Sequence, residues 1–306
     1  MKQITKKKVL AKVWKQTMVT AAALSVLAFV GCGGTAGSPS GTGTGNVSSS
    51  GTSESAGQTG GEIAGQAAGE KDQLARIQEA GKITVAMEGT WAPWTYHDEE
   101  DVLVGYDVEV AKQIADKLGV EAEFIEGEWD GLLAGLEAGR YDIMVNGVDY
   151  TEERAQKYDF SVPYGYIRTA IIVNGDNTDI NSFEDLNGKT TANTISSTYA
   201  ELAESYGATT TGVDDLNQTI ELLLQKRIDA TLNAEVTFYD YMGVHPDADL
   251  KIAALTDEAN NVCIPLRKGA DSVSLREAIN QAIGELKEDG TLGEISVKYF
   301  GTDITK

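Results

Sequence analysis

From Lys71 to the C-terminus, the chain alternates segments with the pattern of strands and segments with the pattern of helices. The run KITVAMEG at 82–89 predicts a strand. Residues 106–118 predict a helix, because apolar side chains that include Ile114 recur at helical spacing and Gly119 follows as a stop signal. Strands that alternate with helices are typical of parallel βαβ units, so we expect an α/β fold.

The alternation occurs in two sets, which indicates two lobes. The first set continues with a strand at 121–128, a helix at 129–139 and a strand at 141–147. The second set begins after residue 175 and predicts a short helix at 182–188, strands at 189–194, 209–213 and 228–233, and helices at 197–207 and 214–227. A strand at 261–269 and helices at 272–290 and 291–301 close the chain. Within 197–207 we expect a capping box formed by Thr198 and Glu201.

Residues 1–31 have the pattern of an export signal. The first 15 residues are basic, and 17–30 form a stretch of 14 apolar or small residues, shorter than the ~20 that a membrane-crossing helix needs. The sequence AFVGC at 28–32 resembles a bacterial lipobox, which implies that Cys32 becomes the lipidated first residue of the mature chain. An uncleaved membrane anchor is the alternative.

The segment 32–70 follows that cysteine and consists almost wholly of small and polar residues. Such a composition cannot bury a core, so we expect a disordered tether between the lipid and the folded body.

The net charge excludes one class of partner. The whole chain carries −22, and the six lysines before residue 20 are the only charged residues of 1–31, so the remainder carries −28. A surface this acidic repels phosphate backbones, and we therefore expect no binding to nucleic acid.

One cation stands in an unusual place. Thr151 has the position of a helix N-cap, and Glu152 follows it in the first turn, where the helix dipole favours negative charge. Arg154 is the exception, which indicates that an anion arrives there from outside. An ion pair on the surface with Glu152 or Asp159 is the alternative.

Three stretches resemble the family 3 solute-binding proteins, the polar amino-acid receptors of ABC importers. They are EGTWAPWTYHDEEDVLVGYDVEVAKQIADKLG at 88–119, WDGLLAGLEAGRYDIMVNGVDYTEERAQKYDFSVPY at 129–164 and LKEDGTLGEISVKYFGTDIT at 286–305. The likeness covers about residues 72–305, and the first and last stretches look most like the cystine-binding branch.

The resemblance implies a type II periplasmic-binding-protein-like fold, with two α/β lobes joined by two hinge strands and a ligand cleft between them. The first lobe would comprise 72–168 plus 262–306, and the second 169–261. The hinge strands would lie near 166–172 and 258–264.

By the same resemblance, Arg154 binds the carboxylate of an amino acid, because guanidinium and carboxylate form a bidentate pair. Ser197 and Thr198 match the position in the second lobe that contacts the same carboxylate. They open a helix, where backbone amides are free. Simple capping of that helix is the alternative.

The ammonium group of the ligand would meet Asn146 and Gly147. Two positions depart from the family pattern: Asp149 stands where Ser or Thr is usual, and Ala234 stands where an Asp is usual. We expect that Asp149 has taken over as the acid that binds the ammonium group, with Glu235 as the second candidate. A solvated turn residue is the alternative for Asp149.

Aromatic side chains would form the walls of the cleft. Trp91 matches the ring that stacks on the ligand, and Trp129 matches the opposite wall. For Trp94 we expect core packing instead. Tyr164 and Tyr199 are weaker candidates at the rim.

The predicted function is that of a lipid-anchored, extracytoplasmic, monomeric receptor that delivers an amino acid to ABC permease subunits. Cystine is favoured as the ligand, and other polar or basic amino acids stay open. A cyclohexadienyl-dehydratase-like enzyme or a ligand-sensing domain is the alternative, although His97 and His245 lie in no recognisable nucleophile or metal motif. We expect no catalytic residue, cofactor or metal.

Overall fold

The computed structural model describes residues 72–306. The predicted export signal at 1–31, the lipidation site at Cys32 and the tether at 32–70 lie outside the described residues.

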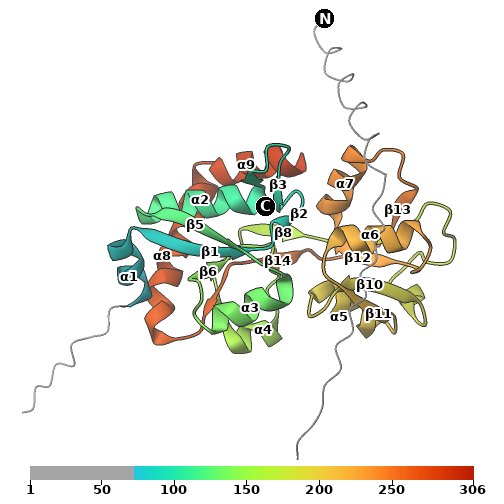
Figure 1. Cartoon of the computed structure of the whole chain (residues 1–306), viewed down its shortest axis with the longest axis horizontal. Helices are drawn as coiled ribbons and strands as arrows, with labels where there is room; N and C mark the ends of the chain where they lie inside the picture. The colour runs from blue at the N-terminus through green and yellow to red at the C-terminus, as the bar shows by residue number, and fades with distance from the viewer. Residues whose placement is uncertain (1–71) are drawn as a thin grey trace, which may run out of the picture. The chain divides into compact units, whose positions relative to one another are not determined.

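The first lobe is built on a five-stranded sheet of order β5-β1-β6-β15-β7 (Figure 1). Strands β5, β1 and β6 are parallel, as the alternating pattern predicts, whereas β15 runs antiparallel to both β6 and β7. The strands are β1 (Lys82–Met87), β5 (Glu121–Glu126), β6 (Ile143–Met144), β7 (Tyr158–Phe160) and β15 (Pro265–Arg267).

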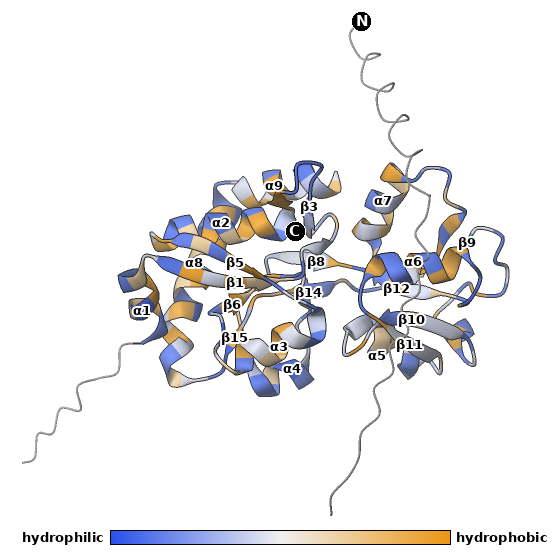
Figure 2. Cartoon of the chain, viewed as in Figure 1, coloured by the Kyte–Doolittle hydropathy of each residue, from blue (hydrophilic) through white to orange (hydrophobic). Residues whose placement is uncertain are grey.

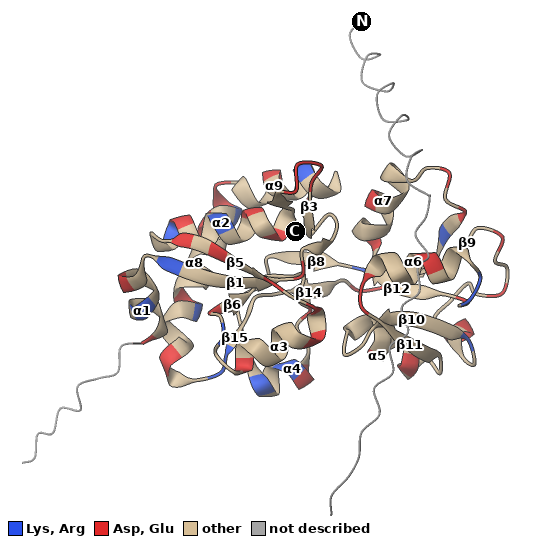
Figure 3. Cartoon of the chain, viewed as in Figure 1, with Lys and Arg blue, Asp and Glu red and all other residues tan. Residues whose placement is uncertain are grey.

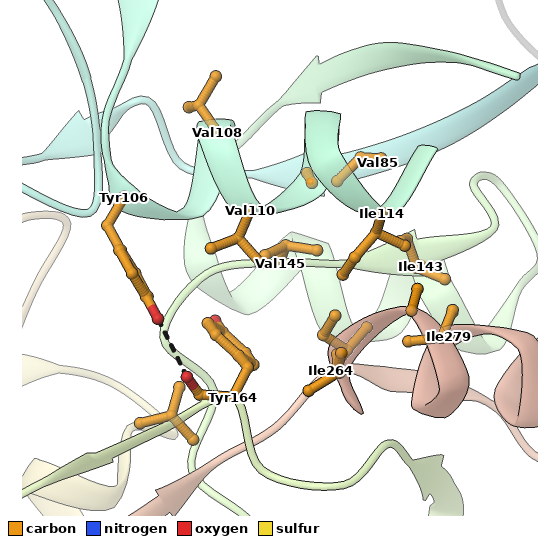
Figure 4. Packing of buried hydrophobic residues seen from close by; sticks show 14 of the residues in the cluster. Val85, Tyr106, Val108, Val110, Ile114, Ile143, Val145, Tyr164, Ile264 and Ile279 are labelled. Atoms are coloured by element: carbon orange, nitrogen blue, oxygen red, sulfur yellow. Dashed lines mark hydrogen bonds between the residues drawn. The ribbon is translucent and has the colours of Figure 1, made fainter. Parts of the chain in front are cut away.

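Helices cover both faces of this sheet, because its strands are apolar on both sides. Along β1, Val85 packs in one core cluster with α2 and α8, and the next residue, Ala86, packs in a second cluster with α3. This alternation is the period-2 pattern of a strand. Figure 4 shows the first cluster, in which Val85 and Ile114 lie close to Ile143. The helices are α1 (Gln73–Ala80), α2 (Tyr106–Leu118), α3 (Trp129–Glu137), α4 (Glu152–Lys157), α8 (Val273–Glu288) and α9 (Thr291–Phe300), with a 3-10 turn, η2, at Ala270–Ser272.

A small three-stranded sheet at the end of β1 completes the lobe. Its strands are β2 (Thr90–Trp91), β3 (Thr95–His97) and β4 (Leu103–Val104). The sequence analysis predicted neither this sheet nor α1.

The second lobe contains an antiparallel group, β12-β9-β13, and a parallel pair, β10-β11. A bridge between Thr191 and Ala230 connects the two groups at the start of β12. The strands are β9 (Thr169–Asn174), β10 (Thr190–Thr194), β11 (Thr209–Val213), β12 (Thr231–Ala234) and β13 (Leu250–Leu255). The helices are α5 (Thr198–Ser205), α6 (Leu216–Leu224) and α7 (Glu235–Val244), with a 3-10 turn, η1, at Glu184–Leu186.

Two short strands link the lobes. Strand β8 (Gly165–Ile167) pairs antiparallel with β14 (Asn260–Val262) between the two main sheets (Figure 1). This arrangement confirms the predicted fold of two α/β lobes joined by two strands.

The predicted capping box of α5 is wrong by one residue. Ser197 is the N-cap, and its side chain accepts a hydrogen bond from the backbone N–H of Ala200 at 3.2 Å. Thr198 is already in the helix, and its hydroxyl donates to Asp149 in the other lobe. Ser197 therefore caps the helix, and the hydroxyl of Thr198 is used in the contact between the lobes.

The whole chain has 47 Asp and Glu against 25 Lys and Arg, and Figure 3 shows acidic residues spread over elements of both lobes. In Figure 2, helices such as α2 and α8 carry both apolar and polar residues along their length. Between residues 72 and 306, every helix is too short or too polar to cross a bilayer.

Candidate ligand-binding site

A cavity lies where the two lobes meet, at the carboxyl ends of several strands. The first lobe contributes Glu88, Thr90, Trp91, Trp129, Asn146, Gly147, Asp149 and Arg154, and the second contributes Asn193, Thr194, Ser197, Thr198, Tyr199, Asp215, Leu216, Thr219 and Asn233. Eight of the nine predicted ligand-binding residues are in this set, and Glu235 is not. Their binding roles stay a prediction.

Arg154 projects from the first turn of α4 into this cavity. The turn is fixed by Thr151, whose hydroxyl accepts from the backbone N–H of Arg154 at 3.1 Å. The guanidinium is buried, and it donates to the carbonyl oxygen of Asp149 at 3.2 Å and to that of Ser196 at 3.1 Å. It also lies 5.3 Å from the ring centroid of Trp129. One cation thus contacts the backbone of both lobes.

The alternative of a surface ion pair for Arg154 is wrong. Asp159 pairs instead with Arg276 at 3.3 Å, and Arg154 is only 8 % exposed. Burial lowers the pKa of Arg154, and the Asp149 carboxylate opposes that change.

Asp149 is held at the cavity by the second linking strand. The backbone N–H of Tyr150 donates to the carbonyl of Asn261 at 2.8 Å, which fixes the loop against β14. The carboxylate oxygen Oδ2 of Asp149 accepts from the hydroxyl of Thr198 at 2.7 Å and from Nδ2 of Asn260 at 3.3 Å. Because the side chain is buried, the alternative of a solvated turn residue is wrong.

Burial raises the pKa of Asp149 to about 6, against the lowering influence of the Thr198 hydroxyl and of Arg154. A cation that enters the site would favour the ionised form of this buried carboxylate and would lower its pKa.

The side chain of Asn146 contacts a partly buried acid, Glu88. Its Oδ1 accepts from the backbone N–H of Glu88 at 2.8 Å, and its Nδ2 donates to Oε2 of Glu88 at 2.7 Å. Burial raises the pKa of Glu88 to about 7. The sequence analysis missed Glu88, although it directly follows β1, and the same reasoning about strand ends that selected Asn146 would have found it.

Gly147 is required by its surroundings. Its φ is +56°, and a Cβ atom there would lie 2.6 Å from the ring of Trp91. The backbone can therefore approach the tryptophan wall only because this residue has no side chain.

Glu235 does not reach the cavity, which corrects its place as the second candidate for the ammonium group. Its backbone N–H donates to the carbonyl of Arg168 at 3.1 Å, and its carboxylate accepts from Nε and Nη2 of Arg168 at 3.0 and 2.7 Å. The start of α7 thus directs this side chain to the strand connection rather than to the ligand site.

Two of the three tryptophans in the described part of the chain line the cavity, and the third does not. Trp91 and Trp129 line the cavity, and the indole N–H of each is buried with no hydrogen-bond partner among the described residues. Trp94 is 1 % exposed and lies in the core cluster. Tyr199 lines the cavity, whereas Tyr164 is wholly buried in the core, so its predicted place at the rim is wrong.

The second lobe adds polar residues that the sequence analysis did not select. Asn193 and Asn233 stand near the carboxyl ends of β10 and β12, and Asp215 caps α6. Oδ1 of Asn193 is buried without a partner among the described residues. The rule about strand ends applies to both asparagines, and it could have identified them.

Together, the fold and the cavity define a two-lobed α/β binding protein of the periplasmic-binding-protein type II class. The chain belongs to the bacterial extracellular solute-binding proteins, family 3, whose family model matches residues 83–302.

Similar proteins are amino-acid-binding proteins. The L-cystine-binding protein TcyA of Bacillus subtilis is 40% identical over 77% of this chain and 87% of its own length. The structure of an ancestral arginine-binding protein bound to arginine has a TM-score of 0.67 and 36% identity, over 72% of this chain and 99% of that one. The L-cystine solute receptor of Neisseria gonorrhoeae, in its unliganded open conformation, has a TM-score of 0.53 and 41% identity, over 76% and 98%.

Proposed function

We propose that this protein is a lipid-anchored receptor on the outer face of the cell membrane that binds a polar amino acid between its lobes, with cystine favoured, and delivers it unchanged to the permease subunits of an ABC importer. The observation that carries the proposal is the buried guanidinium of Arg154 in a cavity lined by both lobes. A buried cation that donates its hydrogen bonds to carbonyl oxygens gains strongly from a carboxylate partner.

The ligand carboxylate would bind Arg154 together with the start of α5. Ser197 and Thr198 stand at that helix N-terminus and line the cavity. Free backbone amides and the helix dipole favour an anion there. A carboxylate bound from both lobes favours the closed arrangement, because opening the lobes would break one half of the contacts.

The ligand ammonium group would bind Asp149. The hydrogen bonds from Thr198 and Asn260 both go to Oδ2 of this carboxylate, and its burial favours a cationic partner. Asn146 and Gly147 lie on the same loop after β6 and line the cavity beside it. This arrangement supports the replacement of the family's usual acid, at Ala234, by Asp149.

The charges of the cavity bear on the identity of the ligand. The lining contains one cation, Arg154, and three acids, Glu88, Asp149 and Asp215. A ligand with two ammonium groups, such as cystine, or with a basic side chain, such as arginine, would place its second cation near the acids. The similarity to L-cystine-binding relatives favours cystine. The side-chain N–H groups of Asn233 can donate to its second carboxylate, whereas Oδ1 of Asn193 can accept from its second ammonium group.

The conformation agrees with a ligand-binding role. The TM-score is higher for the arginine-bound structure than for the unliganded open one, although the sequence identity is lower. Hydrogen bonds from Arg154 to Ser196 and from Thr198 to Asp149 join the lobes across the cavity. We take this structure to represent the closed state.

We assign 72–168 plus 262–306 to the first lobe and 169–261 to the second, with the linking strands β8 and β14 as the hinge. The export signal at 1–31, lipidation at Cys32 and the tether at 32–70 would place this monomeric receptor at the membrane.

Calorimetry of the 71–306 fragment against the common amino acids and cystine tests the proposal. We expect binding that Arg154→Ala weakens by ~2–5 kcal/mol, with Arg154→Lys as the charge-preserving comparison. Affinities unchanged in Arg154→Ala would contradict the carboxylate assignment, and a bound amino acid that mass analysis finds converted would show an enzyme instead.

A further inference from the structure

A hydrogen bond outside the cavity also joins the two lobes. The indole Nε1–H of Trp94, in the turn between β2 and β3, donates to the hydroxyl of Thr237 in the first turn of α7 at 3.0 Å. Both side chains are only 1 % exposed, and neither lines the ligand cavity. A ligand in the cavity therefore does not have to displace this bond, unlike the bonds that Arg154 and Thr198 make across the cavity.

Trp94 also contacts a residue of the cavity wall. Its ring stacks on that of Trp91, with centroids 5.1 Å apart and planes at 16°. On its other sides Trp94 meets the edge of Tyr106 and the tilted ring of Phe300, so it cannot shift independently of the first lobe. Val236, the residue before Thr237, belongs to the same core cluster.

The first turn of α7 is also fixed at its other end. The bidentate pair of Glu235 with Arg168 ties this turn to the chain where it leaves β8. The first turn of α7 is thus bonded through Glu235 to the chain after β8 and through Thr237 to the first lobe.

We propose that Trp94 and Thr237 are positioning residues that set ligand affinity by stabilising the closed state, without contact to the ligand. This inference rests on the proposed function. Opening the lobes would expose the indole N–H and the apolar surface of Val236 to water, whereas closing them buries both. The observed affinity scales with the fraction of closed, competent protein, so a change at Thr237 weakens every ligand by the same factor.

Thr237→Val is the decisive variant, because valine keeps the shape and removes the acceptor, so the closed state would bury an unpaired N–H. We expect weaker binding of cystine and arginine by one common factor of about 5- to 50-fold, from the free energy of an unsatisfied buried donor. The change should appear in the dissociation rate. Thr237→Ser retains the hydroxyl and should bind within about twofold of the unaltered protein.

Thr191→Val is the matched control. Thr191 is a buried threonine of the second lobe whose hydroxyl bonds to that of Thr210 within the same lobe. We expect this variant to lower the melting temperature and to leave both affinities unchanged. A ligand-dependent factor for Thr237→Val, or an unchanged affinity, would overturn the inference.

The two proposals can fail separately. Small-angle scattering of the ligand-free protein reports lobe closure directly, and Thr237→Val should give a larger radius of gyration than Thr237→Ser. If the unaltered protein binds no amino acid, the proposed function fails, whereas the scattering comparison still decides on the contact between Trp94 and Thr237.

Discussion

The hydroxyl of Thr198 donates to Oδ2 of Asp149 at 2.7 Å and so joins the first turn of α5 to the loop after β6. This bond connects the two lobes through the residue that we propose binds the ammonium group of the ligand. A serine or threonine at position 149 would carry no charge there, whereas the aspartate brings a buried carboxylate beside the Arg154 guanidinium. We therefore propose that Asp149 both holds the lobes together and binds the cation of the ligand.

A pair of substitutions separates the two candidate acids. Asp149→Asn should weaken amino-acid binding by about 10- to 100-fold, because it removes a buried charge partner of the ammonium group. Glu235→Gln should change the affinity by no more than about twofold, because the amide oxygen can still accept a hydrogen bond from Arg168. It should lower the melting temperature slightly, because the ion pair is lost. Calorimetry and thermal unfolding of both variants measure these effects, and equal affinity losses would contradict the assignment.

The affinity should depend on pH. Burial raises the pKa of Asp149 to about 6 and that of Glu88 to about 7, and only the ionised carboxylates attract an ammonium group. Binding should therefore be tightest above pH 7 and weaken as the pH falls to 5, by up to about tenfold per pH unit and group.

Two variants show which carboxylate causes each step of the pH profile. Asp149→Asn should remove the lower step and Glu88→Gln the upper one, in titrations followed by calorimetry. A profile for the unaltered protein that is flat from pH 8 to pH 5 would show that neither carboxylate meets the ligand cation.

Asp107 should make the protein less stable as the pH rises. Its carboxyl is buried beside Tyr164, and burial raises its pKa from 3.8 to about 7. Between these values the folded state holds a proton that the unfolded chain has lost, so the free energy of unfolding falls through this window, by at most about 1.4 kcal/mol per pH unit.

Asp107→Asn keeps an oxygen for the Tyr164 hydroxyl and has no proton to lose. The difference in unfolding free energy between this variant and the unaltered protein should therefore grow in the variant's favour from pH 4 to pH 7 and then stay constant. Urea unfolding at four or more pH values measures it, and a constant difference throughout would refute the account.

Gly147→Ala should disturb the ligand site more than the fold. The new methyl group would lie 2.6 Å from the Trp91 ring and displace this wall of the cavity. We expect an affinity loss of at least about tenfold, which corresponds to ~1.4 kcal/mol, with a change in tryptophan emission. Gly139→Ala is the control, because Gly139 also has a positive φ, +68°, with no atom within 4 Å of the new methyl group. If both variants lost the same affinity, backbone strain and not contact with Trp91 would explain the effect of Gly147→Ala.

The sequence predicted the elements with clear periodicity and the residues at strand ends. Helix α2 matches its prediction because its apolar face and Gly119 leave little ambiguity. Helix α7 was missed because its own apolar residues are spread around the helix and show no helical period. The antiparallel strand β13, which follows α7, was missed as well.

At the site, Arg154, Asp149 and Asn146 could be predicted because they follow one strand closely. The partner of Glu235 could not, because its ion pair with Arg168 joins residues 67 positions apart in the sequence. Contacts of this kind depend on how the lobes pack, which no local pattern records.

Strand β15 lies between β6 and β7 in the first sheet, although it comes more than a hundred residues later in the chain. During synthesis, the ribosome therefore releases β7 long before its neighbour exists, whereas 169–261 emerges as one uninterrupted segment. The second lobe can therefore acquire its native structure while the sheet of the first lobe still lacks strand β15.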